Sequence, residues 1–465
     1  MIYLANSKNK LLLLFTFALL LACQGLANKG ESEINGTNKP IKTNAITSTV
    51  TQKIITNIST DTHIPSLSAF TPTADQAPES NGKTNLVVSN DGIVHIVWSD
   101  NRNGTWDVYY SYSTDEGLTF SDPITVETST SSNNAKGNPA LAINPLGKVY
   151  VAWEDWRNNN WDIYYAYLKN DGAFSDSIRA SFDNTGINQR YPVITIGIND
   201  AIYLAWSEIK GQDISRIYYS YAEKSDMTLS ENIPIDPEGE GSQQDPTIGI
   251  DSKSRVHFVW ADKRSGSYSI FHSFTNEAGK FGEGEIVANG IMSDLGDYKP
   301  QFSIDSNDNI HVVWTCAYIK HPGYGVNLFL PLYSNSMDRG ATFAPSRQIS
   351  KGFSYVSTGQ NSTAISATSS GIHIVLETNS PRDGAILWYY NSRDNGLTFL
   401  SGAEIEKGDD RNYYDMDITV SNNGNIHVAW ITTQSAGQSK FKYWVNYSRS
   451  LDGGKTFTLA KTFEN

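Results

Sequence analysis

Val94-His95-Ile96-Val97-Trp98 is the first copy of a short motif that recurs along most of this chain. The motif is an aliphatic residue, His or Tyr, an aliphatic residue, a small or aliphatic residue, and Trp. The later copies, of which one ends in Leu, are Val149–Trp153, Ile202–Trp206, Val256–Trp260, Ile310–Trp314, Ile372–Leu376 and Ile426–Trp430. Successive copies lie 55, 53, 54, 54, 62 and 54 residues apart, counted at the last residue. A period of this kind indicates a repeat architecture.

Each repeat holds four short stretches with strand-like composition, separated by turn residues such as Asn90-Asp91-Gly92. Four antiparallel strands repeated around an axis form the blade of a β-propeller. Neighbouring blades cover the faces that one blade cannot bury alone. We therefore predict an all-β fold, a single propeller of about seven four-stranded blades over residues 84–465, with six or eight blades as alternatives. The 62-residue spacing predicts an insertion near residues 317–330.

The composition agrees with strands and turns rather than helices. Aromatic residues make up 12% of the chain, and Gly occurs 36 times. The net charge of −13 argues against a general nucleic-acid binder, which needs a basic surface. Two cysteines are too few for a disulfide scaffold. We expect no nucleic-acid partner.

The N-terminal segment has the features of an export signal. Lys8 and Lys10 precede an apolar run at residues 11–21 that is too short to span a bilayer. Leu20-Leu21-Ala22-Cys23 resembles the lipobox of bacterial lipoproteins. The resemblance implies a signal peptide at residues 1–22 and a lipid on Cys23 that holds the protein at a membrane. An ordinary secretory signal with a chance cysteine is the alternative.

Residues 23–83 are rich in Ser, Thr, Asn and Lys and have poor apolar periodicity. This composition predicts a flexible polar tether between the lipidated cysteine and the propeller. Gln24 follows the cysteine, which in the enterobacterial sorting pattern goes with the outer membrane. We therefore expect the bacterial cell envelope, and the outer membrane in particular, as the location.

A second motif occurs in four clean copies, which are Ser113–Phe120, Ser336–Phe343, Ser392–Phe399 and Ser450–Phe457. These copies resemble the Asp-box, or BNR repeat, of sialidases and related propellers. In each copy we expect the Asp to accept backbone N–H groups, the Gly to supply a positive φ, and the Phe to pack under the turn. In sialidases such turns lie on the face away from the active site. The resemblance implies the propeller fold, and the turns are interpreted as structural.

The loops between second and third strands open on the opposite face and repeat acidic, Arg and aromatic residues. Arg pairs with carboxylates through two parallel hydrogen bonds, and aromatic rings stack on sugars. One interpretation is a glycan-binding face. The other is that each Asp and Arg pair within their own loop, while the Trp side chains cover the blade edge. The residues concerned are Asp100, Arg102 and Trp106 in blade 1, Asp155, Trp156, Arg157 and Trp161 in blade 2, and Asp262 and Arg264 in blade 4.

Arg190-Tyr191-Pro192 resembles the Arg-Ile-Pro motif of sialidases, although it lies in the third blade rather than the first. The resemblance implies that Arg190 binds a substrate carboxylate, with Glu208 and Asp213 as further weak catalytic candidates. A sialidase also needs a Tyr nucleophile and two more arginines, which the sequence does not identify. Asn138-Pro139, Asp245-Pro246 and Lys299-Pro300 occupy the same place without Arg.

Polysaccharide lyases built on seven-bladed propellers are a second enzyme comparison, because they use His and Tyr. Five histidines share one position of the repeat, which indicates a structural role: His95, His257, His311, His373 and His427. His321 lies in the irregular insertion and is a weak catalytic candidate. Cys316 belongs to an apolar strand and is interpreted as buried.

The first function hypothesis is a surface lipoprotein whose propeller binds an extracellular glycan or protein. A sialidase-like hydrolase of acidic sugars and a non-catalytic envelope scaffold are the alternatives. No zinc or phosphate-binding pattern is present, so no cofactor is expected. The Asp-rich stretch Asp305–Asn309 fits either calcium or a plain hairpin turn.

Overall fold

The computed structural model describes residues 84–463, with gaps at 128–133, 183–185, 198–199, 211–213, 224–227, 237–240, 277–278, 289–295, 321–326, 351–353, 357–362, 381–383, 409–411 and 438–439. The signal, lipidation and tether predictions therefore lie outside the described residues, as do Asp213 and His321. Within the described ranges no helix is long and apolar enough to cross a membrane.

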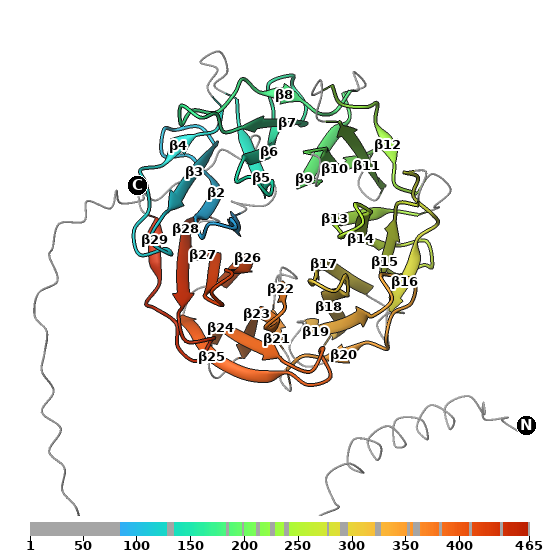
Figure 1. Cartoon of the computed structure of the whole chain (residues 1–465), viewed down its shortest axis with the longest axis vertical. Coiled ribbons are helices and arrows are strands. Elements are labelled where there is room, and N and C mark those ends of the chain that lie inside the picture. Colours follow the sequence, from blue (N-terminus) through green and yellow to red (C-terminus); the bar gives the residue numbers. More distant parts are fainter. Residues whose placement is uncertain are drawn as a thin grey trace, which may run out of the picture. The chain divides into compact units, whose positions relative to one another are not determined.

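Seven antiparallel sheets surround a central axis, and each is built from one continuous stretch of chain (Figure 1). Blade 1 contains β1 (Thr84–Val88), β2 (Val94–Asp100), β3 (Asp107–Ser113) and β4 (Ile124–Thr125). Blade 2 contains β5 (Lys136–Ile143), β6 (Val149–Asp155), β7 (Asp162–Tyr167) and β8 (Ile178–Arg179). Blade 3 contains β9 (Asn188–Ile196), β10 (Ile202–Ile209), β11 (Ser215–Ala222) and β12 (Ile233–Pro234). Blade 4 contains β13 (Gln243–Ile250), β14 (Val256–Asp262), β15 (Ser269–Phe274) and β16 (Glu285–Ala288).

The remaining three blades carry longer hairpins. Blade 5 contains β17 (Gly296–Ile304), β18 (Ile310–Lys320), β19 (Asn327–Ser336) and β20 (Arg347–Gln348), and β21 (Ser354–Val356) also pairs with β19. Blade 6 contains β22 (Thr363–Thr368), β23 (Gly371–Ser380), β24 (Gly384–Ser392) and β25 (Leu400–Gly408). Blade 7 contains β26 (Asn412–Val420), β27 (Ile426–Gly437), β28 (Lys440–Ser450) and β29 (Lys461–Phe463). The predicted seven-bladed, all-β fold is confirmed.

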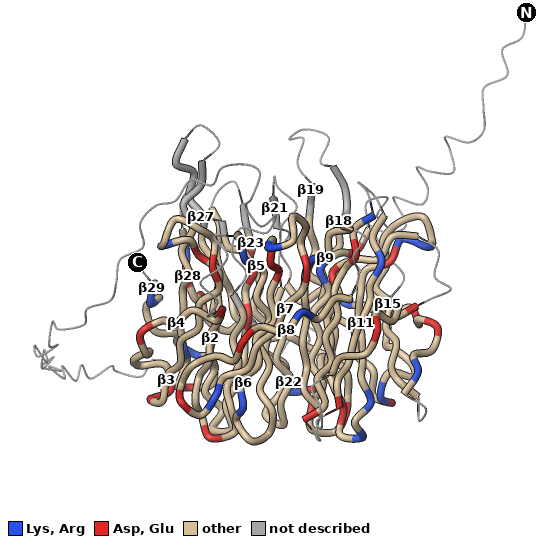
Figure 2. Tube along the Cα trace, turned by 90° about the horizontal axis from the view of Figure 1, so that it is seen from above, with Lys and Arg blue, Asp and Glu red and all other residues tan. Residues whose placement is uncertain are grey.

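The predicted insertion lengthens the β18–β19 hairpin. Trp260 pairs with Phe271 in blade 4, whereas the equivalent Trp314 pairs with Leu332 in blade 5. The extra residues extend the hairpin at the end of the blade where the β2–β3 loop of blade 1 also lies. Figure 2 turns the chain by 90° and shows β18, β19, β23 and β27 towards one end of the ring.

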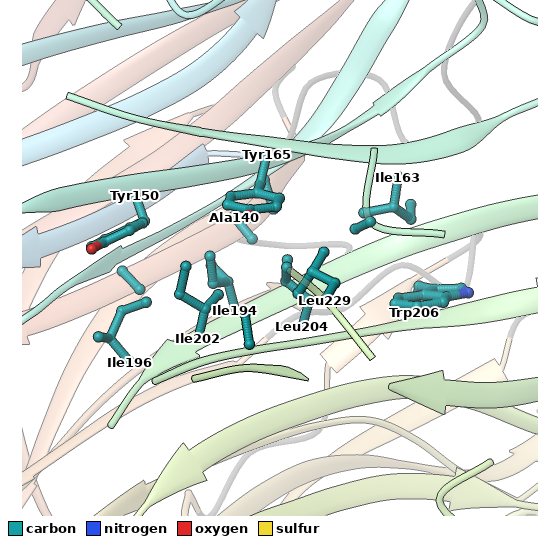
Figure 3. Packing of buried hydrophobic residues seen from close by; sticks show 14 residues of the cluster. Ala140, Tyr150, Ile163, Tyr165, Ile194, Ile196, Ile202, Leu204, Trp206 and Leu229 are labelled. Atoms are coloured by element: carbon teal, nitrogen blue, oxygen red, sulfur yellow. The ribbon is translucent and has the colours of Figure 1, made fainter. Parts of the chain in front are cut away.

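The tryptophan that ends the repeat motif is the main core residue of its blade. Trp98, Trp153, Trp206, Trp260, Trp314 and Trp430 are all fully buried. Between blades 2 and 3, Trp206 and Leu204 pack in one cluster with Tyr165 and Ile163 (Figure 3). Burying one indole removes about 150–250 Å² from water, which stabilises the fold by about 4–6 kcal/mol before entropy costs. The six tryptophans therefore join six of the seven pairs of neighbouring blades, and Leu376 takes this place between blades 5 and 6.

The four clean copies of the second motif form identical turns, here named S-x-D turns after their residues 113–120, 336–343, 392–399 and 450–457. In the first, the Asp115 carboxylate accepts hydrogen bonds from the Thr119 backbone N–H (2.8 Å) and hydroxyl (2.6 Å). The Gly117 N–H donates to the Ser113 hydroxyl (2.8 Å), and Gly117 has φ of 82°. The local roles expected for Asp and Gly therefore match the geometry of these turns.

These four turns also contact the preceding blade. Gly117 of blade 1 lies against Tyr447 of blade 7, and the Phe120 ring meets the Tyr447 ring edge-on at 4.9 Å between centroids. Gly396 contacts Tyr333, Gly454 contacts Tyr389, and Gly340 contacts His272 in the same way. The glycine is thus required twice, by its backbone conformation and by the aromatic side chain of the neighbouring blade.

Replacing Gly117 by Ala is expected to destabilise the protein by about 2–4 kcal/mol. A Cβ atom there would lie 1.8 Å from the Tyr447 hydroxyl oxygen, and the positive φ adds backbone strain. Gly92→Ala is the matched control, because Gly92 has φ of 85° but no heavy atom within 4 Å of the added carbon. It should cost about 1 kcal/mol. Denaturant unfolding of both variants tests this, and equal losses would contradict the blade contact.

The five histidines of the repeat motif face the third strand of their own blade. In four blades the His Nδ1 lies 2.7 Å from a Tyr hydroxyl: His95 with Tyr110, His311 with Tyr333, His373 with Tyr389 and His427 with Tyr447. In blade 4 His257 Nδ1 instead lies 3.0 Å from His272 Nε2. All five histidines are buried, in line with the structural role that we expect.

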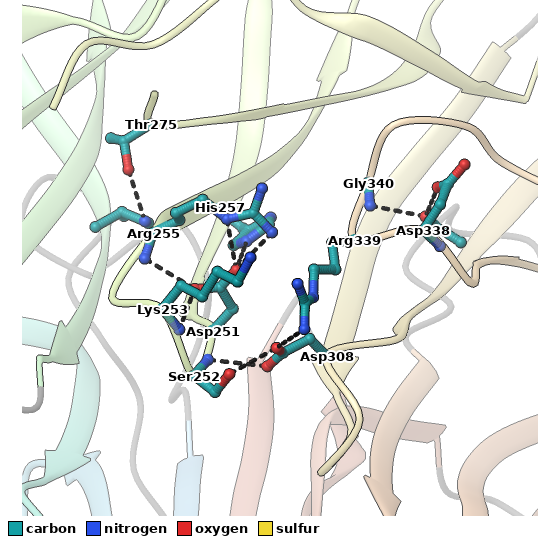
Figure 4. Close-up of polar contacts among 12 residues, drawn as sticks. Asp251, Ser252, Lys253, Arg255, His257, Thr275, Asp308, Asp338, Arg339 and Gly340 are labelled. Carbon is teal, nitrogen blue, oxygen red and sulfur yellow. Dashed lines mark hydrogen bonds and ion pairs between the residues drawn. The ribbon is translucent and has the colours of Figure 1, made fainter. Parts of the chain in front are cut away.

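The turns beside blade 4 are joined by polar contacts (Figure 4). Asp251 accepts a hydrogen bond from Arg255 Nε (2.7 Å) and lies 3.3 Å from His257 Nε2. Ser252 donates its hydroxyl to Asp308 of blade 5 at 2.6 Å. The Asp305–Asn309 stretch is a hairpin turn in which Asp305 accepts the backbone N–H groups of Asn307 and Asn309.

The ring closes without sharing a strand between its two ends. Asp417 of β26 accepts hydrogen bonds from the Asn85 side chain and the Leu86 N–H of β1, both at 2.8 Å. Phe463 of β29 packs against Trp98 of β2 with 5.2 Å between ring centroids. Side-chain contacts between blades 7 and 1 therefore hold the two ends of the propeller together.

Candidate binding site at the central cavity

The innermost strands of five blades bulge at the same place. The residue at the bulge has a left-handed backbone in every case: Asn138 (φ 47°), Tyr191 (59°), Asp245 (54°), Lys299 (51°) and Asp415 (42°). The first four precede a proline, and the strand register shifts across each of the five sites. Such strained residues cost about 1–3 kcal/mol each and concentrate at functional sites.

The bulges surround one end of a central cavity of about 450 Å³. All seven innermost strands line it, and ligand pockets typically measure about 300–1,000 Å³. Tyr191, Asp245, Lys299 and Asp415 belong to the lining at the bulged end. The bulges lie near the start of each innermost strand. In blade 5 the start of β17 pairs with the end of β18, as Asp297 opposite Cys316 shows. The bulged end therefore faces the same way as the loops between second and third strands. The S-x-D turns lie at the opposite end of the blades.

Polar contacts order the cavity wall. The Asp245 carboxylate accepts the Lys299 N–H at 3.2 Å, which joins blades 4 and 5. Asp417 accepts hydrogen bonds from blade 1, as described above. Asp245, Lys299 and Asp415 are half-buried and belong to the cavity lining. In the sequence, Asp245 and Lys299 are distinguished only as X-Pro positions that lack Arg. The X-Pro pattern shared by these strands was the available signal.

The repeated Asp and Arg of the rim loops pair with each other. Arg102 Nη2 lies 2.5 Å from Asp100, and Arg157 and Arg264 make the same contact with Asp155 and Asp262. Each Asp also accepts a hydrogen bond from the core Trp two residues earlier, at 2.7–3.2 Å. Each guanidinium lies over an aromatic ring of the third strand, 3.9–4.3 Å away for Tyr164 and Tyr109 and 4.4 Å for Phe271.

Two of these arginines also bind an acid of the preceding blade. Arg157 pairs with Glu127, and Arg264 pairs with Asp236 at 2.6 Å. The pairs therefore stiffen the loops and link blades, as the second interpretation of the sequence expects. A ligand-binding role for these six residues remains a prediction.

The rim tryptophans cover the start of the next blade. Trp106 and Trp161 are only 6% and 5% exposed and pack in one cluster with Ala135 and the half-buried Trp156. The Trp106 carbonyl accepts the Lys136 N–H (2.9 Å), and the Trp161 carbonyl accepts the Gln189 N–H (2.7 Å). Trp156 is the rim tryptophan that retains exposed surface beside this cluster.

Of the sialidase-like candidates, Arg190 and Glu208 lie within the described residues, and each forms an ion pair with another side chain. Arg190 is 3% exposed, and its Nε lies 2.7 Å from Glu154 of blade 2, which is fully buried. Glu154 also accepts hydrogen bonds from the Asn138 side chain (2.7 Å) and the Tyr191 N–H (2.6 Å). Glu208 pairs with Lys210 at 3.0 Å. The catalytic role of Arg190, Glu208 and Asp213 stays a prediction.

Two other buried carboxyl groups have perturbed acidity. Burial raises the pKa of Glu377, on β23, to about 8, opposed by a hydrogen bond from the Tyr413 N–H. Burial also raises the pKa of Asp297 to about 6, opposed by contacts with Cys316 and Trp314. In blade 5 Cys316 stands where blades 1, 2 and 4 carry the Asp that accepts from the core Trp, and Asp297 lies opposite Cys316 on the neighbouring strand. Cys316 is buried, as expected.

Glu377→Gln is expected to stabilise the protein by about 2 kcal/mol at pH 8 and to destabilise it by about 1–3 kcal/mol at pH 4, where the parent carboxyl group is protonated and only the cost of burying the amide remains. The folded-state pKa lies above the unfolded value of 4.5, so stability falls as the pH rises from 4.5 to about 8. This shift corresponds to about 4–5 kcal/mol at most, and burying an amide costs about 1–3 kcal/mol of it. Urea unfolding at both pH values measures the difference. A variant that is less stable than the parent at pH 8 would contradict the assignment.

Among the described residues no group of three or more His, Cys, Asp or Glu side chains is arranged to hold a metal ion. The Asp305 carboxylate accepts hydrogen bonds from the Asn307 and Asn309 backbone N–H groups and from the Asn309 side chain of its own turn.

No family model and no curated protein matches the sequence. The solved structure of an ulvan lyase, a polysaccharide lyase of family PL25 bound to -[GlcA(1-4)Rha3S]-, aligns with a TM-score of 0.55 and 11% identity over 82% of this chain and 94% of the lyase. The NanB sialidase from Streptococcus pneumoniae aligns at 0.45 and 12% over 82% and 69% of the two chains. An α-L-arabinanase from Penicillium chrysogenum aligns at 0.44 and 14% over 66% and 92%. At these identities, the likeness to the lyase shows a shared propeller fold.

Proposed function

We propose that this chain is a bacterial envelope lipoprotein whose propeller binds a glycan at the bulged end of the central cavity. One observation carries the proposal. Four strained, mostly polar residues line the same end of a cavity of about 450 Å³, on the face away from the S-x-D turns. Strained backbone conformations cluster at functional sites, which supports a ligand site at this end of the cavity.

The size of the cavity favours a small saccharide over a protein. A stable protein interface covers about 800 Å² on each partner, which requires a broad surface. The cavity instead supplies a concave space with carboxylates, one ammonium group and the Tyr191 side chain. These are hydrogen-bonding and stacking groups of the kind that sugar hydroxyls and ring faces use. The ulvan lyase of the same fold is itself bound to a saccharide, which supports this class of ligand.

A cavity-blocking variant tests this proposal. Gln301→Trp places an indole at an exposed position of the cavity lining, and Leu146→Trp places one at an exposed turn at the opposite end of blade 2. The full chain, purified in detergent, is applied to a glycan array and then titrated with its best ligand. We expect the first variant to lose at least tenfold in affinity and the second to bind like the parent. Glycan binding that survives the blocked cavity would contradict the location.

The anchor is tested separately. Cells that express the chain are fed a radiolabelled or alkyne-bearing palmitate, and the label is sought on the purified protein. We expect label on the parent chain and none on Cys23→Ser, which should also leave the membrane fraction. A parent chain that carries no lipid would contradict the lipoprotein assignment and leave an ordinary secreted protein.

A sialidase-like activity is tested by a separate assay. Release of 4-methylumbelliferone from its sialic acid conjugate by the full chain would assign hydrolysis to the propeller. We expect no release, because the Arg190 guanidinium is bound to Glu154 rather than turned to the cavity. Release that vanishes in a folded Arg190→Lys variant would contradict a binding-only propeller.

A further inference from the structure

We infer that the central cavity selects uncharged sugars over acidic ones. The inference rests on the proposed glycan-binding function and names the class of ligand. It follows from the charges that line the cavity and from the positions of the arginines nearby. It points away from the acidic substrates that the sialidase resemblance implies.

The ionisable groups among the described lining residues are mostly acidic. They comprise the carboxylates of Asp245, Asp415 and Asp417 and the ammonium group of Lys299. The Asp245 carboxylate accepts a hydrogen bond from the backbone N–H of Lys299, so a negative charge stands beside the one cationic residue among the described lining residues. A ligand carboxylate or sulfate placed here would meet more negative than positive charge. In a partly enclosed space, such repulsion is screened less than in bulk water.

The arginines that would offset these charges are committed elsewhere. Arg190 is the guanidinium closest in sequence to the cavity, and it pairs with the fully buried Glu154. Arg157 and Arg264 each bind two carboxylates, and Arg102 binds Asp100. Turning one of them to a ligand would leave a buried or half-buried carboxylate without its partner. No arginine is among the described residues that line the cavity, so they supply no bidentate arginine clamp for a sugar acid.

Carboxylates are good acceptors for neutral sugars. Each carboxylate offers two oxygens, and adjacent sugar hydroxyls can donate one hydrogen bond to each. Asp245 and Asp415 are half-buried and stand on bulged strands, in which the backbone fixes the direction of the side chain. Both have a left-handed backbone, a conformation that Asn also tolerates. Asp→Asn changes at these two positions therefore alter charge while preserving shape.

The test uses pairs of oligosaccharides that differ by one carboxylate, such as glucose-terminated and glucuronate-terminated versions of one chain. Calorimetry with the full chain in detergent should show the neutral member bound at least tenfold more tightly. Added salt should improve binding of the acidic member, because it screens the repulsion. Lys299→Met should widen the preference. The double change Asp245→Asn and Asp415→Asn should bring it below about threefold.

Asp171→Asn is the control, since Asp171 is exposed in a turn of blade 2 and pairs with Lys169. It should leave the preference unchanged. Equal or tighter binding of the acidic member would overturn the inference while keeping the proposed function. A preference that the Asp245 and Asp415 changes do not alter would also overturn it. Failure to bind any glycan would contradict the proposed function itself, and the inference with it.

Discussion

Lowering the pH from 7 to 5 is expected to destabilise this protein by about 3–6 kcal/mol. Burial lowers the pKa of four histidines of the repeat motif to about 4, namely His95, His257, His373 and His427. At His95 and His257 the charge of a nearby Asp opposes this effect. Burial and the neighbouring His257 place the pKa of His272 well below 6.5. The unfolded chain takes up protons below pH 6.5 and the folded chain does not, so stability is lost as the pH falls.

The size of the expected stability loss is the difference between the effect of the histidines and that of two buried carboxyl groups. Each of the five buried histidines should cost about 1.5–2 kcal/mol between pH 7 and 5. Glu377 and Asp297 have raised pKa values, of about 8 and 6, and should return a few kcal/mol over the same interval. The histidines outnumber these carboxyl groups, so the net effect is a loss. Denaturant unfolding followed by Trp fluorescence at pH 7 and pH 5 measures it.

His272 allows a matched pair of variants. His272→Tyr replaces the His–His contact of blade 4 by the His–Tyr contact seen in four other blades, against the same turn glycine. It should reduce the acid loss by about 2 kcal/mol. Tyr389→His makes the reverse change in blade 6, where Tyr389 now meets His373, and should increase the loss. Equal stability of the parent at the two pH values would contradict the role of the histidines.

Removing the Arg190 side chain is expected to destabilise the fold by about 3–5 kcal/mol. Arg190→Met leaves the Glu154 carboxylate fully buried with only the Asn138 and Tyr191 donors. A buried charge that loses its partner is costly because water cannot replace the ion pair. Guanidinium unfolding measures the loss. Adding Glu154→Gln should recover part of it, since the buried charge is then removed.

Lys210→Met is the control for Arg190, because Lys210 is 40% exposed in its pair with Glu208 and should contribute at most about 1 kcal/mol. If Arg190→Met unfolds like the parent chain, the Arg190–Glu154 pair does not stabilise the propeller. The prediction also bears on activity assays. A loss of any activity in an Arg190 variant reports on catalysis only where the variant is shown to be folded.

Local sequence was sufficient for most of the fold. The motif that ends in Trp98 predicts a buried second strand, because the alternation of side chains and the strand preference of β-branched residues are properties of a few neighbouring residues. The S-x-D turns are likewise made by hydrogen bonds within eight residues, as Ser113, Asp115 and Thr119 show. The insertion at 317–330 was visible because a regular period reveals any departure from it.

The candidate site was less accessible from sequence. The alternating Asp and Arg of the rim resemble a ligand-binding face, and only the folded chain pairs Arg157 with Glu127 of the preceding blade. Arg190 was singled out by a motif, yet it meets Glu154, which lies 36 residues earlier in another blade. Asp245 and Lys299 can be identified as lining residues of one cavity only from the ring of strands in the folded chain.

The sequence by itself determined the period, the strand positions and the local turns of this protein, because these depend on contacts between residues close in the chain. The tertiary structure alone decided which charges are neutralised, which residues line the cavity and why Gly117 must lack a side chain. Tyr447, which occupies the space beside Gly117, is 330 residues away in the sequence. Such contacts arise only when seven blades close into a ring, and no local pattern encodes them.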